Sequence, residues 1–274
     1  MTSSAMTSPD TTWHLAVQEQ MIDGADLVEK FANAQRAGFD GIELQGAGGG
    51  AFAARLPELR AARDAGVVIP SVCVMMDHFI GDFDPDRRRS AHEGMQDLLT
   101  VIVEAGGTGA ITPASFGMFS TRLPPFTPPR GPEEDRKILL DELHALGEHA
   151  ASVGAVLLLE PLNRYEDHMV NTLADAADLV REVGLESVRV MADTFHMSIE
   201  EADPAASLRE VAPWLGHIQL GDSNRLEPGA GHLDWATVVA VLGEIGYDGW
   251  LAMECGLSGP PAEALPTVAR LLSA

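Results

Sequence analysis

Hydrophobic residues recur along the chain in a repeating order: a short apolar run, a polar loop, and a longer segment whose apolar residues lie three or four positions apart. Short uninterrupted apolar runs are typical of strands that helices cover on both faces. The longer segments have the spacing of one helix face, as in residues 26–37, where Leu27, Phe31 and Ala34 recur before Gly38 ends the pattern. The pattern therefore predicts buried parallel strands that alternate with amphipathic helices.

Eight strands can be counted in this pattern. They are predicted at residues 13–17, 41–45, 68–76 and 110–115, and in the four apolar runs that end at Glu160, Asp193, Gln219 and Glu254. Helices are predicted at residues 26–37, 56–65, 85–105, 133–153, 173–183, 204–211, 235–245 and 265–272. Alternation of eight strands with helices predicts an α/β fold, the parallel (β/α)8 TIM barrel. An open doubly wound sheet is less favoured, because no Gly-rich phosphate-binding turn follows the first strand.

The length of 274 residues suits one barrel, which commonly takes about 250 residues. We expect a disordered tail rich in Ser and Thr at residues 1–12 and a single catalytic barrel domain at residues 13–274. The stretch Phe116–Pro132 has five prolines between Pro124 and Pro132 and is too long for a simple connector. It is predicted to be a lid or an interface segment.

Charge and composition narrow the range of partners. The formal net charge of −23 repels phosphate backbones, so we expect no nucleic-acid partner. Two isolated cysteines, Cys73 and Cys255, do not form a disulfide framework, and a reducing, cytoplasmic location is expected. The chain has no run of about 18 apolar residues, so no membrane span is expected either.

Polar side chains end the last four predicted strands: Glu160, Asp193, Gln219 and Glu254. Ends of consecutive parallel strands meet at one end of a barrel, so these groups are expected to converge. Crowded carboxylates repel one another, and a divalent cation removes that penalty. An all-oxygen set, with Gln219 using its amide carbonyl, suits Mn²⁺ or Mg²⁺, with Co²⁺ also possible. The alternative is that each carboxylate separately caps a helix or pairs with a nearby arginine.

A second group of polar residues follows the candidate ligands closely along the chain. Glu166 comes six positions after Glu160, His196 three after Asp193, and Arg225 six after Gln219. Loops that follow barrel strands carry substrate contacts, so Glu166, His196 and Arg225 are predicted to face a substrate above the metal.

The runs at residues 160–166, 193–201 and 221–225 resemble the sugar isomerase/epimerase superfamily, whose members have a xylose-isomerase-like barrel. They are most similar to ketose 3-epimerases of the D-tagatose and D-psicose 3-epimerase type. The resemblance implies that Glu160 and Glu254 both bind the metal and exchange protons with the sugar. It also implies that Asp193 is a metal ligand and that Glu166, His196 and Arg225 contact substrate oxygens.

Gln219 departs from the epimerase motif, which has a metal-binding histidine at this position. A glutamine here is similar to the hydroxypyruvate isomerases of the same superfamily. His217 lies two residues earlier on the same strand face, one layer deeper, so Gln219 is preferred as the ligand. The departure leaves the exact substrate open.

The function that follows from these motifs is a metal-dependent sugar isomerase or epimerase that acts on a free ketose through a metal-stabilised enediolate. The alternative is a lyase on a keto sugar, of the inosose dehydratase or C-glycoside deglycosidase subunit type; the latter would require a second protein subunit. Less favoured are an endonuclease IV-like DNA-repair enzyme and a non-catalytic sugar-binding barrel. The superfamily often forms dimers or tetramers, so a homo-oligomer is expected.

Overall fold

The computed structural model describes residues 13–119 and 127–272. The predicted tail at residues 1–12 and part of the proline-rich stretch lie outside the described residues. Strands and helices alternate along the chain. The strands are β1 (His14–Gln18), β2 (Gly41–Ala47), β3 (Ser71–Met75), β4 (Gly109–Pro113), β5 (Val156–Glu160), β6 (Val188–Asp193), β7 (Leu215–Leu220) and β8 (Trp250–Met253).

The helices occupy the segments between these strands and the segment after β8. They are α1 (Leu27–Arg36), α2 (Ala51–Ala54), α3 (Leu56–Asp64), α4 (Pro85–Glu104), α5 (Pro132–Val153), α6 (Leu173–Val183), α7 (Thr194–Glu200), α8 (Pro204–Val211), α9 (Trp235–Glu244) and α10 (Pro261–Leu272). Side chains of Asp26, Thr172 and Asp234 accept hydrogen bonds from the first turns of α1, α6 and α9. These caps explain where the helices begin.

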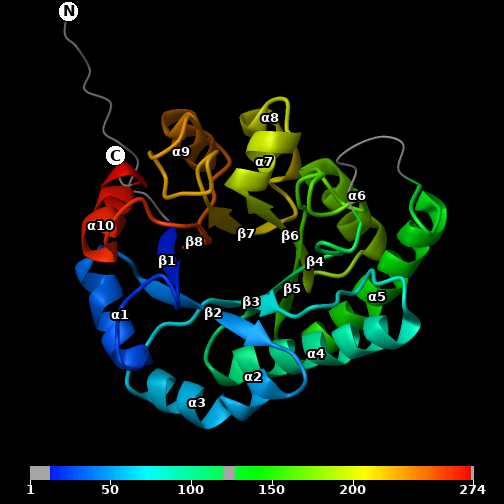
Figure 1. Cartoon of the computed structure of the whole chain (residues 1–274), viewed down its shortest axis with the longest axis horizontal. Coiled ribbons are helices and arrows are strands. Elements are labelled where there is room, and N and C mark those ends of the chain that lie inside the picture. The colour runs from blue at the N-terminus through cyan, green and yellow to red at the C-terminus, as the bar shows by residue number, and fades with distance from the viewer. Residues whose placement is uncertain (1–12, 120–126, 273–274) are drawn as a thin grey trace, which may run out of the picture.

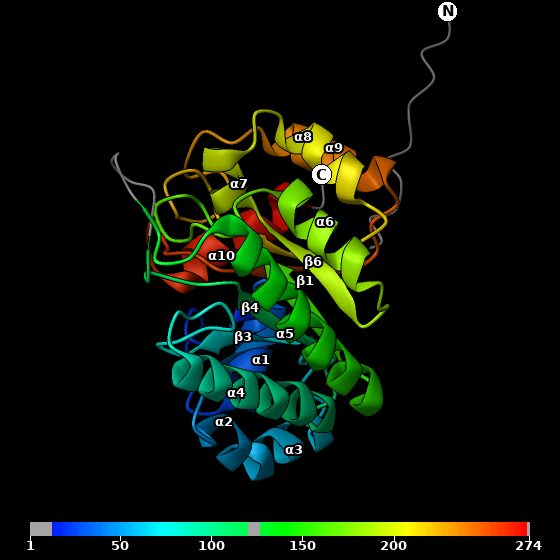
Figure 2. The ribbon, with the colours of Figure 1, turned by 90° about the vertical axis from the view of Figure 1, so that its right-hand side faces the viewer.

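The eight strands form a closed parallel barrel in sequence order, with β1 paired to both β2 and β8. The predicted TIM barrel is therefore confirmed. Figure 1 shows the helices around the strands, with colours that follow one another around the ring from blue α1 to red α10. Figure 2 shows α4 and α5 next to each other on the outer face. Within residues 13–119 and 127–272, no helix is both long and apolar enough to cross a membrane.

Alternate residues of each strand face two different cores. In β5, Leu157 and Leu159 belong to the large core between strands and helices, whereas Leu158 belongs to a small cluster inside the barrel with Cys73, Ile111 and Met191. Side chains along a strand alternate between its faces, so residues two positions from an inward residue also point inward. Glu160 and Asp193 therefore face the barrel interior, directly above Leu158 and Met191.

A bulge in β7 changes which of its residues point inward. Val190 pairs with Leu215, but Met191 pairs with His217, so Gly216 is an extra residue opposite β6. Beyond the bulge, Asp193 pairs with Gln219. An extra residue reverses the alternation of the strand that follows it. The bulge thus places Gln219 inward and beside Asp193.

Three details differ from the sequence-based prediction. The third strand begins at Ser71, not at residue 68, because Pro70 has no N–H to donate to a strand ladder. The short helices α2 and α7 were not predicted. The last helix begins at Pro261, before the predicted residue 265, and contains Pro266.

Candidate active site

The four predicted metal ligands converge at the C-terminal end of the barrel. Glu160 and Asp193 end β5 and β6, Gln219 is the next-to-last residue of β7, and Glu254 follows β8 directly. The first three are buried, and Glu254 is partly exposed. All four lie at inward positions of their strands, and this shared orientation brings them together.

The four candidate ligands form a ring, and burial together with neighbouring negative charges raises the pKa of its three carboxylates. Burial, then the neighbouring Glu254, raises the pKa of Asp193 to about 8. Burial, followed by Glu254 and Asp193, raises the pKa of Glu160 well above its usual value. Burial and the charge of Glu43 raise the pKa of Glu254. Arg225 is the cation that opposes these shifts, and it does not cancel them.

Two oxygens of the ring have the properties expected of metal ligands. Asp193 Oδ1 accepts from the backbone N–H groups of Phe195 (2.7 Å) and His196 (3.1 Å), and so caps α7. Asp193 Oδ2 and Gln219 Oε1 are buried and have no hydrogen-bond partner among the described residues. Buried acceptors without partners are costly, and a hard divalent cation would satisfy both. The residues present therefore fit such an ion, and Asp193 is both a helix cap and a candidate ligand.

His196 lies beside the ring. One nitrogen of its imidazole lies within 4.8 Å of a carboxylate oxygen of Glu160 and of Asp193, and this spacing could also hold a cation. However, His196 Nδ1 accepts from the backbone N–H of Asn163 (3.1 Å) and from its side-chain amide (2.8 Å). These two hydrogen bonds assign the imidazole proton to Nε2, which lies 3.7 Å from Glu160 Oε1. Burial and then Arg225 lower the pKa of His196 to about 3, so it is neutral and acts as a donor.

The three predicted substrate-contacting residues also come together. Glu166 lies 3.8 Å from His196 Nε2 through one oxygen and 3.6 Å from Arg225 Nη1 through the other. Together with Glu160 and Glu254 they line a cavity of about 220 Å³. The remaining wall of this cavity is largely apolar and includes Met75, Met76, Phe79, Phe116 and Leu162. The cavity lining thus combines the charged and polar groups of the site with a largely apolar remainder.

Arg225 is held by the loop that follows β7. It is the non-glycine residue with positive φ among the described residues (φ 56°), and its guanidinium lies 4.6 Å above the Phe195 ring. Buried Asp222 accepts from the backbone N–H groups of Gly229 and Leu233 and from Trp235 Nε1. Despite its burial, these and other hydrogen bonds lower the pKa of Asp222 to about 2. An ionised Asp222 therefore fixes the loop that presents Arg225.

The floor beneath the ring contains residues that were not predicted. Glu43 is fully buried in the middle of β2 and accepts from Gln18, Ser71, Gln219 and His217. Gln18 Nε2 also donates to Glu254 Oε1 (3.1 Å), and the Cys73 thiol donates to the same oxygen (3.5 Å). His217 faces this floor, below Gln219, as predicted. A glutamate between the apolar residues Ile42 and Leu44 of β2 was the sequence signal for this floor.

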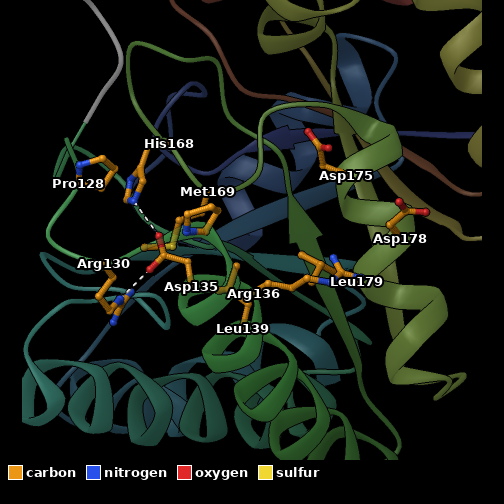
Figure 3. A pocket seen from close by; sticks show the side chains of 11 residues that line it. Pro128, Arg130, Asp135, Arg136, Leu139, His168, Met169, Asp175, Asp178 and Leu179 are labelled. Atoms are coloured by element: carbon orange, nitrogen blue, oxygen red, sulfur yellow. Dashed lines mark hydrogen bonds and ion pairs between the residues drawn. The ribbon is translucent and has the colours of Figure 1, made fainter. Parts of the chain in front are cut away.

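A second pocket of about 380 Å³ lies outside the barrel mouth, between α5, α6 and the loop after β5. Figure 3 shows Arg130 and His168 on either side of Asp135, at 2.6 Å and 3.3 Å from its carboxylate oxygens. The neighbouring Asp167 accepts from Ser115 and from the backbone N–H of Met169. The Arg130 guanidinium pairs with Asp135, and this cluster anchors the loop that carries Glu166.

Residues 31–274 match the family described as the xylose isomerase-like TIM barrel. The chain belongs to this family. It is 38% identical to the 3-dehydro-D-guloside 4-epimerase of Escherichia coli (strain K12) over 241 residues, which are 88% of this chain and 91% of that protein. It is 41% identical to a D-psicose 3-epimerase of Enterocloster bolteae over 177 residues, 62% of this chain and 56% of that protein.

Solved structures of xylose isomerase-like proteins agree with this assignment. The crystal structure of a 3-keto-D-glucoside 4-epimerase from E. coli has a TM-score of 0.88 at 35% identity and covers 96% of this chain and 100% of that chain. A D-psicose 3-epimerase from Clostridium cellulolyticum has a TM-score of 0.75 at 23% identity, which shows the shared fold. The predicted superfamily is confirmed, and relatives that are carbohydrate epimerases and isomerases support the predicted enzyme class.

Proposed function

We propose that this protein is a metal-dependent epimerase of keto sugars. The observation that carries the proposal is that Glu160 and Glu254 reach one cavity from β5 and β8, both with raised pKa. Carboxylates with raised pKa are suited to remove and return a proton. The ring of Glu160, Asp193, Gln219 and Glu254 would hold the metal, with Mn²⁺ or Mg²⁺ favoured by its oxygen atoms.

The relatives indicate which carbon reacts. In a 3-dehydro-guloside inverted at C4, and in a ketose inverted at C3, the reacting carbon lies next to a carbonyl. Its hydrogen is acidic because the resulting negative charge spreads onto the carbonyl oxygen. We infer that the substrate here has the same unit, a ketone beside a secondary alcohol, in a keto glycoside or a free ketose.

In the proposed reaction, one of Glu160 and Glu254 removes the proton from this carbon, and the other returns a proton to the opposite face. A bound divalent ion would supply Lewis-acid stabilisation of the negative charge that develops on the substrate oxygens. His196 Nε2–H and the Arg225 guanidinium are donors that would orient those oxygens, and Glu166 would accept from a substrate hydroxyl. The apolar wall of the cavity would contact the part of the sugar that does not react.

The test is deuterium exchange followed by NMR. Mn²⁺-loaded protein in D₂O would be incubated with 3-keto glycosides and with free ketoses, and we expect deuterium next to the carbonyl together with a new epimer. Glu160→Gln and Glu254→Gln should each slow conversion by at least about 100-fold. Glu148→Gln, an exposed change of the same chemistry on α5, should not slow it.

Other outcomes of this experiment decide against the proposal. Release of a leaving group instead of inversion would identify the lyase alternative. Absence of exchange with every keto sugar, in protein that holds stoichiometric metal, would reject epimerisation. Assembly as a homo-oligomer and a cytoplasmic location stay predictions, to be checked by light scattering and by fractionation.

A further inference from the structure

Glu43 is surrounded by four hydrogen-bond donors and lies below the ring of candidate ligands. Its Oε1 accepts from Gln18 Nε2 (3.0 Å) and Gln219 Nε2 (2.7 Å). Its Oε2 accepts from Ser71 Oγ (2.7 Å) and lies 2.9 Å from His217 Nε2. The side chain has no solvent exposure. A buried carboxylate with this many donors is held firmly in one position.

The position of Glu43 determines which end of the Gln219 amide faces upward. An ionised carboxylate only accepts hydrogen bonds, so the amide atom 2.7 Å from it must be the nitrogen. The other end, Oε1, then points away from Glu43 and is the buried oxygen without a partner. If the amide were rotated by half a turn, its N–H groups would face the position of the cation, and N–H groups cannot ligate a metal.

We propose that Glu43 is a positioning residue that selects the carbonyl oxygen of Gln219 as a metal ligand. The inference rests on the metal site of the proposed function. It also extends to Glu254, because Gln18 Nε2 donates to both Glu43 and Glu254 and so connects the floor to a second ligand. Glu43 itself has no direct part in proton transfer.

The test measures Mn²⁺ binding to metal-free protein, from the electron paramagnetic resonance signal of the free ion, with no substrate present. Glu43→Gln can donate as well as accept, so it no longer fixes the Gln219 amide. We expect its dissociation constant to rise by about 10-fold to 100-fold, the range seen when partners of metal ligands are removed. Glu227→Gln is the matched control, since Glu227 is a buried glutamate that accepts from the Ser258 backbone N–H, and its affinity should be unchanged.

A double-mutant cycle separates positioning from a general structural role. With Glu43 intact, the carboxylate introduced by Gln219→Glu would face the Glu43 carboxylate at hydrogen-bond distance. Repulsion between the two charges would offset the gain from a charged ligand, so the dissociation constant for Mn²⁺ should change by less than about threefold. In the Glu43→Gln background the same substitution supplies an oxygen ligand at either orientation. There we expect it to restore most of the lost affinity.

The outcomes are distinct. Two results would overturn the positioning role alone. One is an equal effect of Gln219→Glu on Mn²⁺ affinity in both backgrounds. The other is a Glu43→Gln protein that is folded by circular dichroism and binds Mn²⁺ within about twofold of wild type. If Glu43→Gln does not fold, Gln219→Glu decides: tenfold tighter binding overturns the inference, and unchanged binding supports it. Failure of the wild-type protein to bind Mn²⁺ would overturn the proposed function together with this inference.

Discussion

Asp193 combines two roles in one carboxylate. Its Oδ1 caps α7 through two backbone N–H groups, and its Oδ2 is a buried acceptor without a partner among the described residues. The cap fixes the side chain in one rotamer, so the second oxygen points into the ring before any ligand arrives. Such preorganisation lowers the ordering cost of binding a cation.

The raised pKa of Asp193 predicts the pH dependence of metal binding. Between its ordinary value and about 8, the folded metal-free protein holds a proton that the unfolded chain has released, so stability from this group falls as pH rises. Mn²⁺ must displace that proton, and its affinity should increase by up to about tenfold per pH unit between about pH 6 and about 8. Titrations at these pH values would measure the slope.

Asp193→Asn is the control for this slope. The amide oxygen can still cap α7, but the proton is gone, so binding should be weaker and should depend less on pH. A wild-type affinity that is constant across the range would show that the ring binds Mn²⁺ without releasing protons.

At the scale of elements, the loop after β7 behaves as one unit built around Asp222. Asp222→Asn replaces an ionised acceptor by an amide, and the hydrogen bonds from Gly229, Leu233 and Trp235 weaken. Hydrogen bonds to charged groups contribute about 1.5 to 3 kcal/mol each, so we expect a loss of this order in the free energy of unfolding. Because Arg225 is presented by the same loop, kcat/KM should also fall.

Urea unfolding and steady-state kinetics of Asp222→Asn would measure the two effects. Asp234→Asn, which alters the cap of α9 at the end of the same loop, is the control that should lower stability slightly and leave kcat/KM close to wild type. Unchanged kinetics in folded Asp222→Asn would show that Arg225 is held by other contacts.

The strands and most helices were predictable because a buried parallel strand and an amphipathic helix leave different hydrophobic periods. The ring was predictable for a related reason: Glu160 and Asp193 stand where apolar runs stop. The floor was not, since Glu43 lies in the middle of β2 and its partner His217 is 174 positions away. Helix α7 escaped prediction because seven residues are too few to show a helical repeat.

At the scale of the whole molecule, the candidate ligands come from four strands, β5 to β8, so binding of a metal by this ring would be coupled to folding. A ligand that binds only the folded state at about 100 times its Kd stabilises it by about 2.7 kcal/mol. For a protein of this size, Mn²⁺ should then raise Tm by about 5 to 10 °C relative to protein in EDTA. Differential scanning calorimetry would measure the shift, and Asp193→Asn with Glu254→Gln should abolish it.

Because of the bulge at Gly216, the number of residues in β7 decides which of them lies beside Asp193. If Gly216 paired with Met191 in a regular ladder, Ile218 and not Gln219 would pair with Asp193, and an apolar side chain would take the place of the amide oxygen. Deletion of Ile218 with the bulge kept would pair Leu220 with Asp193, and so remove a ligand without altering any codon for a ring residue. The length of β7 is as much a determinant of the site as the residues that β7 carries.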